Sequence, residues 1–126
     1  MRLLVDSAFV IDYLKDDPGA VSRWAEVFGH GDDPVINEIV VCEVRAGLRE
    51  RDLAAFASFI EPVEFVQPGP DHALLAGQWR AEARAIGRSL SLADSLIAAA
   101  ADASDAAVLT RNVRDFAMTP IRIETY

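Results

Sequence analysis

Four acidic residues occupy positions in this sequence from which a carboxylate could do chemistry. Asp6 follows the short apolar run 3–5, Glu43 interrupts a second apolar segment, and Asp94 and Asp115 lie at the start of two later helical patterns. Taken one at a time, Asp6, Asp94 and Asp115 have the spacing of helix caps, which is the default explanation for each. Glu43 must either face solvent or have a strong partner, because an unpaired buried carboxylate is costly.

If the fold brings the four side chains together, they could form one site rather than four separate helix caps or surface residues. A buried parallel strand over 2–5 would place Asp6 at its carboxyl end, the edge of an open α/β sheet where ligands bind. Asp115 follows the strand expected beside it, and Glu43 and Asp94 come from helices expected to begin near that edge. Carboxylates gathered there would repel one another unless a cation held them. Oxygen ligands without His or Cys favour Mg²⁺ or Mn²⁺, and such a site suits hydrolysis of phosphodiester bonds.

The pattern of apolar residues predicts the elements that would position these acids. Short β-branched runs predict strands at 2–5, 35–37, 63–66, 107–109 and 120–123, and helical spacing predicts helices at 8–16, 18–28, 38–48, 52–60, 71–88, 91–103 and 112–116. The segment 38–48 is rich in β-branched residues, but its apolar positions recur at helical spacing. Strands alternating with helices predict a parallel sheet joined by right-handed crossovers. We therefore expect an α/β fold, a three-layer α/β/α sandwich of about five parallel strands.

Length and composition are those of one globular domain spanning residues 1–126, with 52% hydrophobic residues. The single cysteine, Cys42, permits no intramolecular disulfide, and with only His30 and His72 beside it a structural zinc site is not expected. Cys42 lies in an apolar run and is predicted to be a core thiol. No leader peptide and no apolar run of membrane-spanning length is present, so we expect a cytoplasmic protein that does not bind membranes.

The net charge of −8, from 20 acidic and 12 basic residues, argues by itself against nucleic-acid binding. That argument weakens if several acids converge on a divalent cation, because the ion inverts the local charge. Eleven of the twelve basic residues are arginines, the side chain suited to bidentate phosphate contacts, and Lys15 is the only lysine. A compositional bias with solvated arginines explains this equally well.

Four segments of the chain resemble the conserved blocks of a known family. They are Leu4-Val5-Asp6-Ser7-Ala8, Glu43-Val44-Arg45-Ala46-Gly47, Leu92-Ala93-Asp94-Ser95-Leu96-Ile97-Ala98-Ala99 and Leu109-Thr110-Arg111-Asn112-Val113-Arg114-Asp115-Phe116. In this order they resemble PIN-domain ribonucleases and, more narrowly, the VapC-type toxins of bacterial toxin–antitoxin pairs. The resemblance covers essentially the whole chain, and its last block is the most specific. It implies a PIN-like fold with a five-stranded parallel sheet between helices.

The resemblance also implies roles for individual residues. The family's four acids, which are its catalytic and metal-binding residues, fall on Asp6, Glu43, Asp94 and Asp115. The first three would hold the principal metal ion, and Asp115 would support a second ion or orient the attacking water. Supporting pocket residues of the family fall on Ser7, Thr110 and Asn112. Arg111 and Arg114 could contact RNA phosphates, although Arg114 could equally pair with an acid. A hydroxyl residue often found three positions before the second acid is Val40 here, so no pocket role is assigned to that turn.

For activity and partners, the resemblance implies Mg²⁺- or Mn²⁺-dependent endonuclease action on RNA, homodimers, and inhibition by a cognate antitoxin. Phe9, Trp24 and Trp79 are predicted to pack in the core or a dimer interface rather than stack on bases. The apolar helix faces around them exceed what short strands can cover, so part of this surface is expected to serve self-association. The predicted helix 71–88 places Leu74 and Trp79 on its apolar face.

Two other functions remain to be weighed. A phospho-receiver signalling domain has a similar size, sheet and acidic Mg²⁺ pocket. It would need an acceptor Asp after the third strand and a Lys after the last, whereas here Val66 is followed by Gln67-Pro68 and the only Lys is Lys15. The third alternative is a catalytically inactive interaction module with the PIN-like fold, because the presence of the four acids does not by itself establish catalysis. Phosphate release from acetyl phosphate, ribonuclease activity, or neither would separate the three.

Overall fold

The computed structural model describes residues 1–126 and contains five strands and seven α-helices. The strands are β1 (Arg2–Val5), β2 (Asp33–Asn37), β3 (Glu64–Val66), β4 (Ala107–Leu109) and β5 (Ile123–Glu124). The helices are α1 (Ser7–Leu14), α2 (Pro18–Gly29), α3 (Glu38–Gly47), α4 (Leu53–Ile60), α5 (Pro70–Ala85), α6 (Leu92–Ala103) and α7 (Val113–Phe116), with a short 3₁₀ turn at Glu50–Asp52 before α4.

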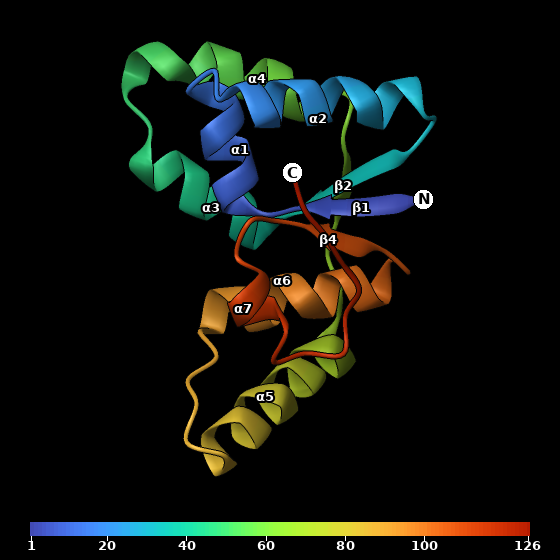
Figure 1. The fold of residues 1–126 in the computed structure, drawn as a ribbon. Helices are drawn as coiled ribbons and strands as arrows, with labels where there is room; N and C mark the ends of the chain where they lie inside the picture. The colour runs from blue at the N-terminus through green and yellow to red at the C-terminus, as the bar shows by residue number, and fades with distance from the viewer.

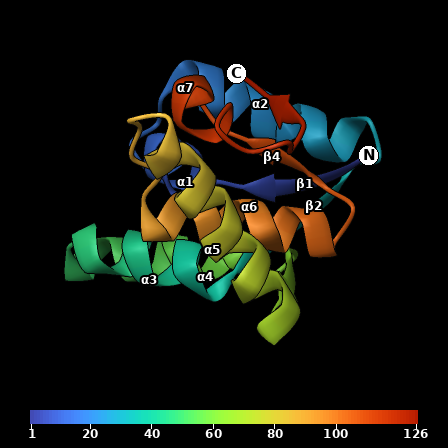
Figure 2. The same ribbon diagram turned by 90° about the horizontal axis from the view of Figure 1, so that it is seen from below.

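All strands are parallel and pair in the order β3-β2-β1-β4-β5, which confirms the predicted fold class. Helices α1, α2 and α4 lie on one side of the sheet, and α5 and α6 lie on the other (Figure 1). Seen from below, α5 crosses α6 in front of the sheet (Figure 2). The central strands β1 and β4 are covered on both faces, which is why Leu3, Leu4 and Val5 are all fully buried.

The strand register fixes where the first polar side chains appear. Val5 pairs with Leu109, and the backbone N–H of Asp6 donates to the carbonyl of Leu109 at 3.1 Å. The next residue of each strand, Asp6 and Thr110, therefore leaves the sheet side by side at its carboxyl edge. In Figure 1 this edge lies on the left, where β1 ends, α6 begins and α7 is located.

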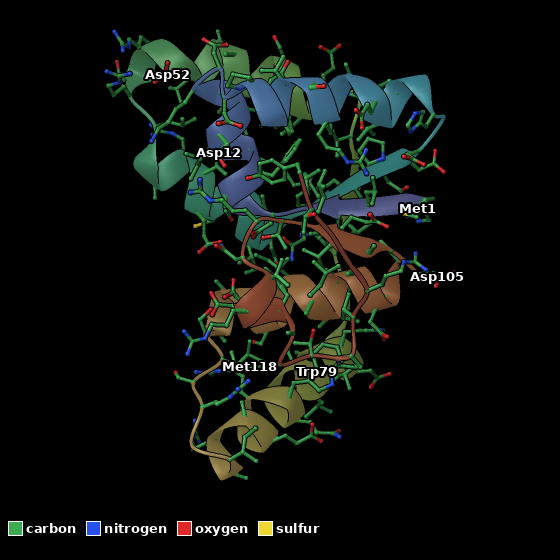
Figure 3. All side chains as sticks on the ribbon, in the orientation of Figure 1. Met1, Asp12, Asp52, Trp79, Asp105 and Met118 are labelled. Carbon is green, nitrogen blue, oxygen red and sulfur yellow. The ribbon has the colours of Figure 1, made fainter.

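The three large aromatic residues singled out in the sequence are part of the monomer's core. Phe9, Trp24 and Trp79 are buried, and Trp24 stacks on Phe59 with ring centroids 4.4 Å apart. Trp79 lies where α5 meets α6 (Figure 3). The prediction of core packing is confirmed. The three rings are covered within one chain, whereas Val21 and Phe28, on the same helix as Trp24, are 41% and 47% exposed. Self-association through the surface around the rings therefore stays a prediction.

Two apolar residues of the fifth helix lie outside the core. Leu74 is 73% exposed although the sequence placed it on the buried face, and Ile86 is 71% exposed. Helix α5 ends at Ala85, three residues before the predicted end. Ile86 is therefore the residue that ends the helix, and its side chain does not follow the helical face that contains Trp79.

Cys42 is exposed, so the prediction of a core thiol is wrong. The helical prediction for its segment is correct, and the helical phase explains the error. Val40 and Val44 are fully buried at the i, i+4 spacing of one face of α3, which turns Cys42, midway between them, to the opposite side. Asp52, the first residue of the predicted helix 52–60, makes no capping bond, and its carboxylate instead accepts from Arg49 at 3.4 Å.

None of the helices in this chain combines the length and the apolar character that a membrane crossing requires.

Candidate active site

Asp6 is the most deeply placed carboxylate at the carboxyl edge of the sheet, with 2% of its surface exposed. Its Oδ1 accepts the backbone N–H of Ser7 at 2.8 Å, and its Oδ2 accepts the hydroxyl of Thr110 at 2.7 Å. Thr110 is itself fixed, because its Oγ1 accepts the backbone N–H of Asn112 at 2.9 Å. The first residue of α1 and the segment after β4, which are far apart in the sequence, therefore hold Asp6 in one orientation, and both donors are neutral.

Glu43 joins this group through Ser7, whose hydroxyl donates to Glu43 Oε1 at 2.6 Å. Glu43 faces solvent on α3 and has this partner as well, so both alternatives raised by the sequence hold. The bond links the start of α1 to the middle of α3. Ser7 thus connects Asp6, through its backbone, to Glu43, through its side chain.

Asn37 positions α3 and was not identified from the sequence. It is buried at the end of β2, its Oδ1 accepts the backbone N–H of Val40 at 3.1 Å, and its Nδ2 donates to the carbonyl of Leu96 on α6 at 3.5 Å. The helix that carries Glu43 is therefore tied to the helix that carries Asp94. The signal was available, because Asn37, like Asp6, is the polar residue that ends a buried strand.

Asp94 lies in the first turn of α6, where its backbone N–H is capped by the hydroxyl of Ser91 at 3.0 Å. Partial burial raises the pKa of the Asp94 carboxyl to about 6, and the charges of Asp6, Asp115 and Glu43 push it in the same direction. The four predicted acids therefore lie near enough to one another for their charges to interact. Capping explains the backbone of Asp94 but leaves its carboxylate without a cation.

Burial also raises the pKa of Asp6, with a smaller contribution from the charge of Glu43. The hydrogen bonds from Thr110 and from the backbone of Ser7 act in the opposite direction. Asp6 and Asp94 are thus two carboxylates whose ionised forms are disfavoured by their surroundings. A positive charge placed between them would remove that penalty.

Chemically, these donors suit Mg²⁺ or Mn²⁺, since all are carboxylate oxygens. Geometrically, the side chains do not form a closed cage, because no three His, Cys, Asp or Glu residues approach closely enough to share one ion. Asp115 is exposed on α7, at the margin of the group. The predicted metal site therefore fits in donor type, although the side chains as they lie do not surround a single ion.

The remaining predicted residues divide between structure and surface. Arg111 forms an ion pair with Asp12 at 2.9 Å, and the hydroxyl of Tyr126 donates to the same carboxylate at 2.6 Å. Asp12 lies on α1 (Figure 3), so this network fastens the first helix to the end of the chain. Asn112 is exposed and acts through its backbone, and Arg114 is exposed with no ion pair.

The chain is similar in sequence to a known protein family and to a named relative. The family model described as "PIN domain" matches residues 3–120. The chain is 36% identical over 117 residues to "Ribonuclease VapC19" of Mycobacterium tuberculosis, covering 93% of this chain and 94% of that protein.

Solved structures give the same result at the level of the fold. VapBC2 from Rickettsia felis, bound to a DNA fragment from its promoter, superposes with a TM-score of 0.86 at 20% identity, covering 100% of this chain and 99% of that chain. DNA-bound VapBC from Salmonella typhimurium superposes with a TM-score of 0.83 at 26% identity, covering 99% and 98%.

Proposed function

The chain belongs to the PIN-domain family and within it to the VapC group, and we propose that it is a Mg²⁺- or Mn²⁺-dependent endoribonuclease that acts as the toxin of a toxin–antitoxin pair. The observation that carries the proposal is the environment of Asp94. Burial and three neighbouring carboxylates raise its pKa to about 6, so a cation bound beside it would relieve the cost of ionising this carboxyl. The relative named as a ribonuclease supports RNA as the substrate.

In this proposal Asp6, Glu43 and Asp94 hold the principal metal ion, and Asp115 supports a second ion or orients the attacking water. The metal, when bound, supplies an activated water and charge stabilisation for phosphodiester hydrolysis. The chain itself orients the ligands. Thr110 and the backbone of Ser7 hold Asp6 in one rotamer, and the Ser7 hydroxyl aligns Glu43 beside it.

Of the two arginines assigned to RNA, Arg114 remains available and Arg111 does not. The Arg111 guanidinium is bound to Asp12, whereas Arg114 has no ion pair. We therefore assign Arg114 to an RNA phosphate and Arg111 to holding the loop between β4 and α7.

The partner we propose is a cognate antitoxin that suppresses cleavage. The solved neighbours described as VapBC and toxin–antitoxin complexes support such a partner. A group of carboxylates with no cation is also a suitable target for an inhibitor's arginine, which would make bidentate contacts.

We further propose a homodimer in the cytoplasm. Apolar surface for it would come from exposed residues such as Leu74 and Ile86 rather than from the buried aromatics.

The direct test is RNA cleavage by the purified chain with Mg²⁺ or Mn²⁺, followed by EDTA. We expect cleavage that EDTA stops and that Asp94→Asn abolishes while the fold is retained, because Asn preserves the size of the side chain. Asp102→Asn is the matched control, since it makes the same change in the last turn of α6, away from the group. An inactive interaction module would cut no RNA with either metal, and equal cleavage by Asp94→Asn would reduce Asp94 to a helix cap.

The toxin role needs its own test. Expression of the chain should arrest growth, co-expression of its antitoxin should restore growth, and Asp94→Asn should be harmless. Light scattering on the isolated chain tests the homodimer separately. Growth that never slows would reject the toxin role, and a strict monomer at micromolar concentration would reject the dimer.

A further inference from the structure

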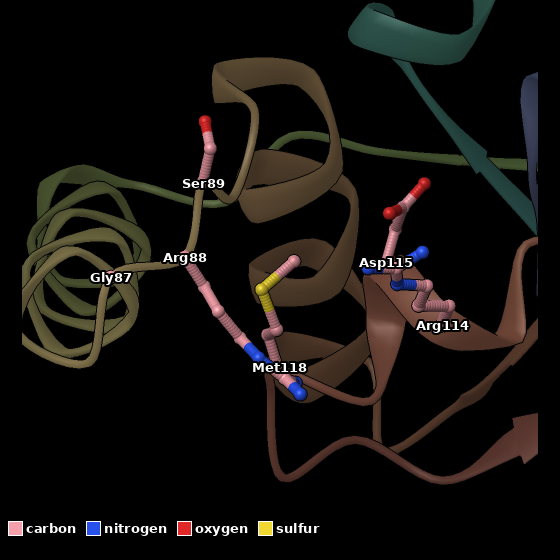
Figure 4. A pocket seen from close by; sticks show the side chains of 6 residues that line it. All are labelled: Gly87, Arg88, Ser89, Arg114, Asp115 and Met118. Atoms are coloured by element: carbon pink, nitrogen blue, oxygen red, sulfur yellow. The ribbon is translucent and has the colours of Figure 1, made fainter.

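A hollow of about 290 Å³ lies beside Asp115, between the loop that joins α5 to α6 and the helix α7. Arg88 and Ser89 contribute to it from the loop, and Arg114 and Asp115 contribute from α7. Figure 4 shows Arg88 extending from the loop toward Met118 on the opposite side. One wall of the hollow therefore carries a proposed active-site carboxylate, and two arginines border the space next to it.

Neither of these arginines has an ion pair, although acidic residues are plentiful in this chain. Arg2, Arg23, Arg49 and Arg111 each pair with a carboxylate, and Arg80 donates to the carbonyl of Leu90 at 3.0 Å. Four other arginines also have no ion pair, namely Arg45, Arg51, Arg84 and Arg122, so Arg88 and Arg114 are distinguished by lining the same hollow beside Asp115. Arg88 and Arg114 line one hollow, and neither guanidinium group there has a carboxylate partner. An anion bound in the hollow could accept hydrogen bonds from both guanidinium groups.

The backbone turns Arg88 into this position. Helix α5 ends in a Schellman motif, in which Gly87 donates to the carbonyl of Arg84 at 3.0 Å and Arg88 donates to the carbonyl of Ala83 at 2.9 Å. Gly87 has a φ of +75°, a conformation that side chains other than glycine adopt at a cost. Had the helix continued through residue 88 as the sequence predicted, Arg88 would have projected from the polar face of α5. The early stop directs it toward α7.

We propose that Arg88 and Arg114 together bind a phosphate of the RNA backbone other than the one that is cleaved. The inference rests on the proposed ribonuclease function and adds a subsite to it. Asp115 borders both the hollow and the carboxylate group, so an RNA strand whose scissile phosphate lies at the carboxylates has a neighbouring phosphate within reach of the hollow. The subsite also explains how a chain of net charge −8 would retain a polyanion beside four acids.

The test is RNA binding in EDTA, where cleavage cannot occur, measured by fluorescence anisotropy with a short labelled single-stranded RNA of mixed sequence. Arg88→Gln should weaken binding about tenfold and lower the slope of log K against log salt by about 0.7, the value for one phosphate contact on a single strand. Arg114→Gln should do the same. Arg84→Gln is the matched control, because it removes the same charge from the last turn of α5, outside the hollow.

Replacing single phosphates of the RNA with neutral methylphosphonate identifies the contact. One substitution should weaken binding to the parent protein and weaken binding to Arg88→Gln clearly less, since only the Arg114 contact with that phosphate then remains to be lost. With a cleavable RNA and Mg²⁺, Arg88→Gln should raise KM with kcat nearly unchanged, as expected for a contact made equally in the bound and transition states.

The subsite is rejected if Arg88→Gln binds RNA as tightly as Arg84→Gln, or if the parent does not bind RNA. It is also rejected if every methylphosphonate substitution weakens binding to Arg88→Gln and to the parent by the same factor. Failure of the ribonuclease proposal has a different signature. In that case the parent cuts no RNA with Mg²⁺ or Mn²⁺, whatever the binding data show.

Discussion

Asp6 and Asp12 are both buried beside α1, with 2% and 8% of their surfaces exposed, yet their partners differ in kind. Asp12 is neutralised within the chain by the guanidinium of Arg111 and also accepts the hydroxyl of Tyr126. Asp6 accepts only from neutral donors, Ser7 and Thr110, and lies among other carboxylates. A buried charge that the fold neutralises serves structure, whereas one that it leaves uncompensated is available for a ligand.

The same substitution at the two sites should affect cleavage very differently. Asp6→Asn keeps the helix cap but removes a charged metal ligand, so we expect kcat to fall by at least about 10³-fold. Asp12→Asn should retain most of the parent's kcat. Rates of RNA cleavage under single-turnover conditions measure both. A comparable loss of rate in Asp12→Asn would mean that the Arg111 network belongs to the active site and that the comparison fails.

Stability should change in the opposite order. Asp12→Asn leaves the Arg111 charge without its partner and should lower the free energy of unfolding by about 1–2 kcal/mol. Asp6→Asn, in EDTA, should leave stability unchanged or raise it, because a carboxylate whose charge is disfavoured becomes a neutral amide. Urea unfolding of the two variants beside the parent gives these values. A clear loss of stability in Asp6→Asn without metal would show that the chain already compensates that charge.

Metal binding should depend on Asp6 and not on Asp12. At a Mg²⁺ or Mn²⁺ concentration about ten times the Kd, preferential binding to the folded state contributes about 1.4 kcal/mol, or a Tm increase of a few degrees. The increase should persist in Asp12→Asn and be reduced in Asp6→Asn. Thermal unfolding followed by circular dichroism, with metal or with EDTA, provides the comparison. If neither metal shifts the Tm of the parent, the proposed metal site is wrong.

The strand and helices that carry Asp6, Glu43 and Asp94 were largely predictable from the sequence, because short runs and spacings of residues determine them. The run 3–5 ends in Asp6, the helical spacing of Val40 and Val44 places Glu43 on α3, and the Ser91 cap fixes the start of α6 before Asp94. The alternation of strands and helices along the chain then predicted a parallel sheet, in which the carboxyl ends of the strands lie at the same edge. That these residues bind metal or catalyse a reaction stays a prediction.

The features that the sequence did not reveal are long-range pairings and side-chain orientations. Arg111 and Asp12 are separated by 99 positions, and Tyr126 and Asp12 by 114, so no local pattern connects them. The exposure of Cys42 depends on helical phase, which an apolar run does not specify. Arg88 was placed at the end of the predicted helix 71–88, whereas α5 ends at Ala85.

The smallest expected effect is on how the free energy of unfolding depends on pH in EDTA, where the uncompensated carboxylate Asp94 should titrate and the neutralised Asp12 provides the contrast. The pKa of Asp94 in the folded protein is about 6, above its ordinary value of 3.8, because of burial and the charges of Asp6, Asp115 and Glu43. The folded state therefore binds this proton more tightly than the unfolded state does. Its contribution to stability is complete below about pH 4 and is lost as the pH rises through about 6. We expect a difference of about 1 kcal/mol, less than the full shift implies because Asp94 is only partly buried.

Urea unfolding of the parent and of Asp94→Asn at pH 4, 5, 6 and 7 isolates this group, since the other titrating residues are common to both. The free energy of unfolding of the parent should fall relative to that of Asp94→Asn as the pH rises. Saturating Mg²⁺ should reverse the trend near neutral pH, because the cation favours the ionised carboxylate. Asp71→Asn, which changes an exposed aspartate in the first turn of another helix, α5, should follow the parent at every pH. A constant difference between the parent and Asp94→Asn over this range would show that the Asp94 charge is already compensated, as that of Asp12 is.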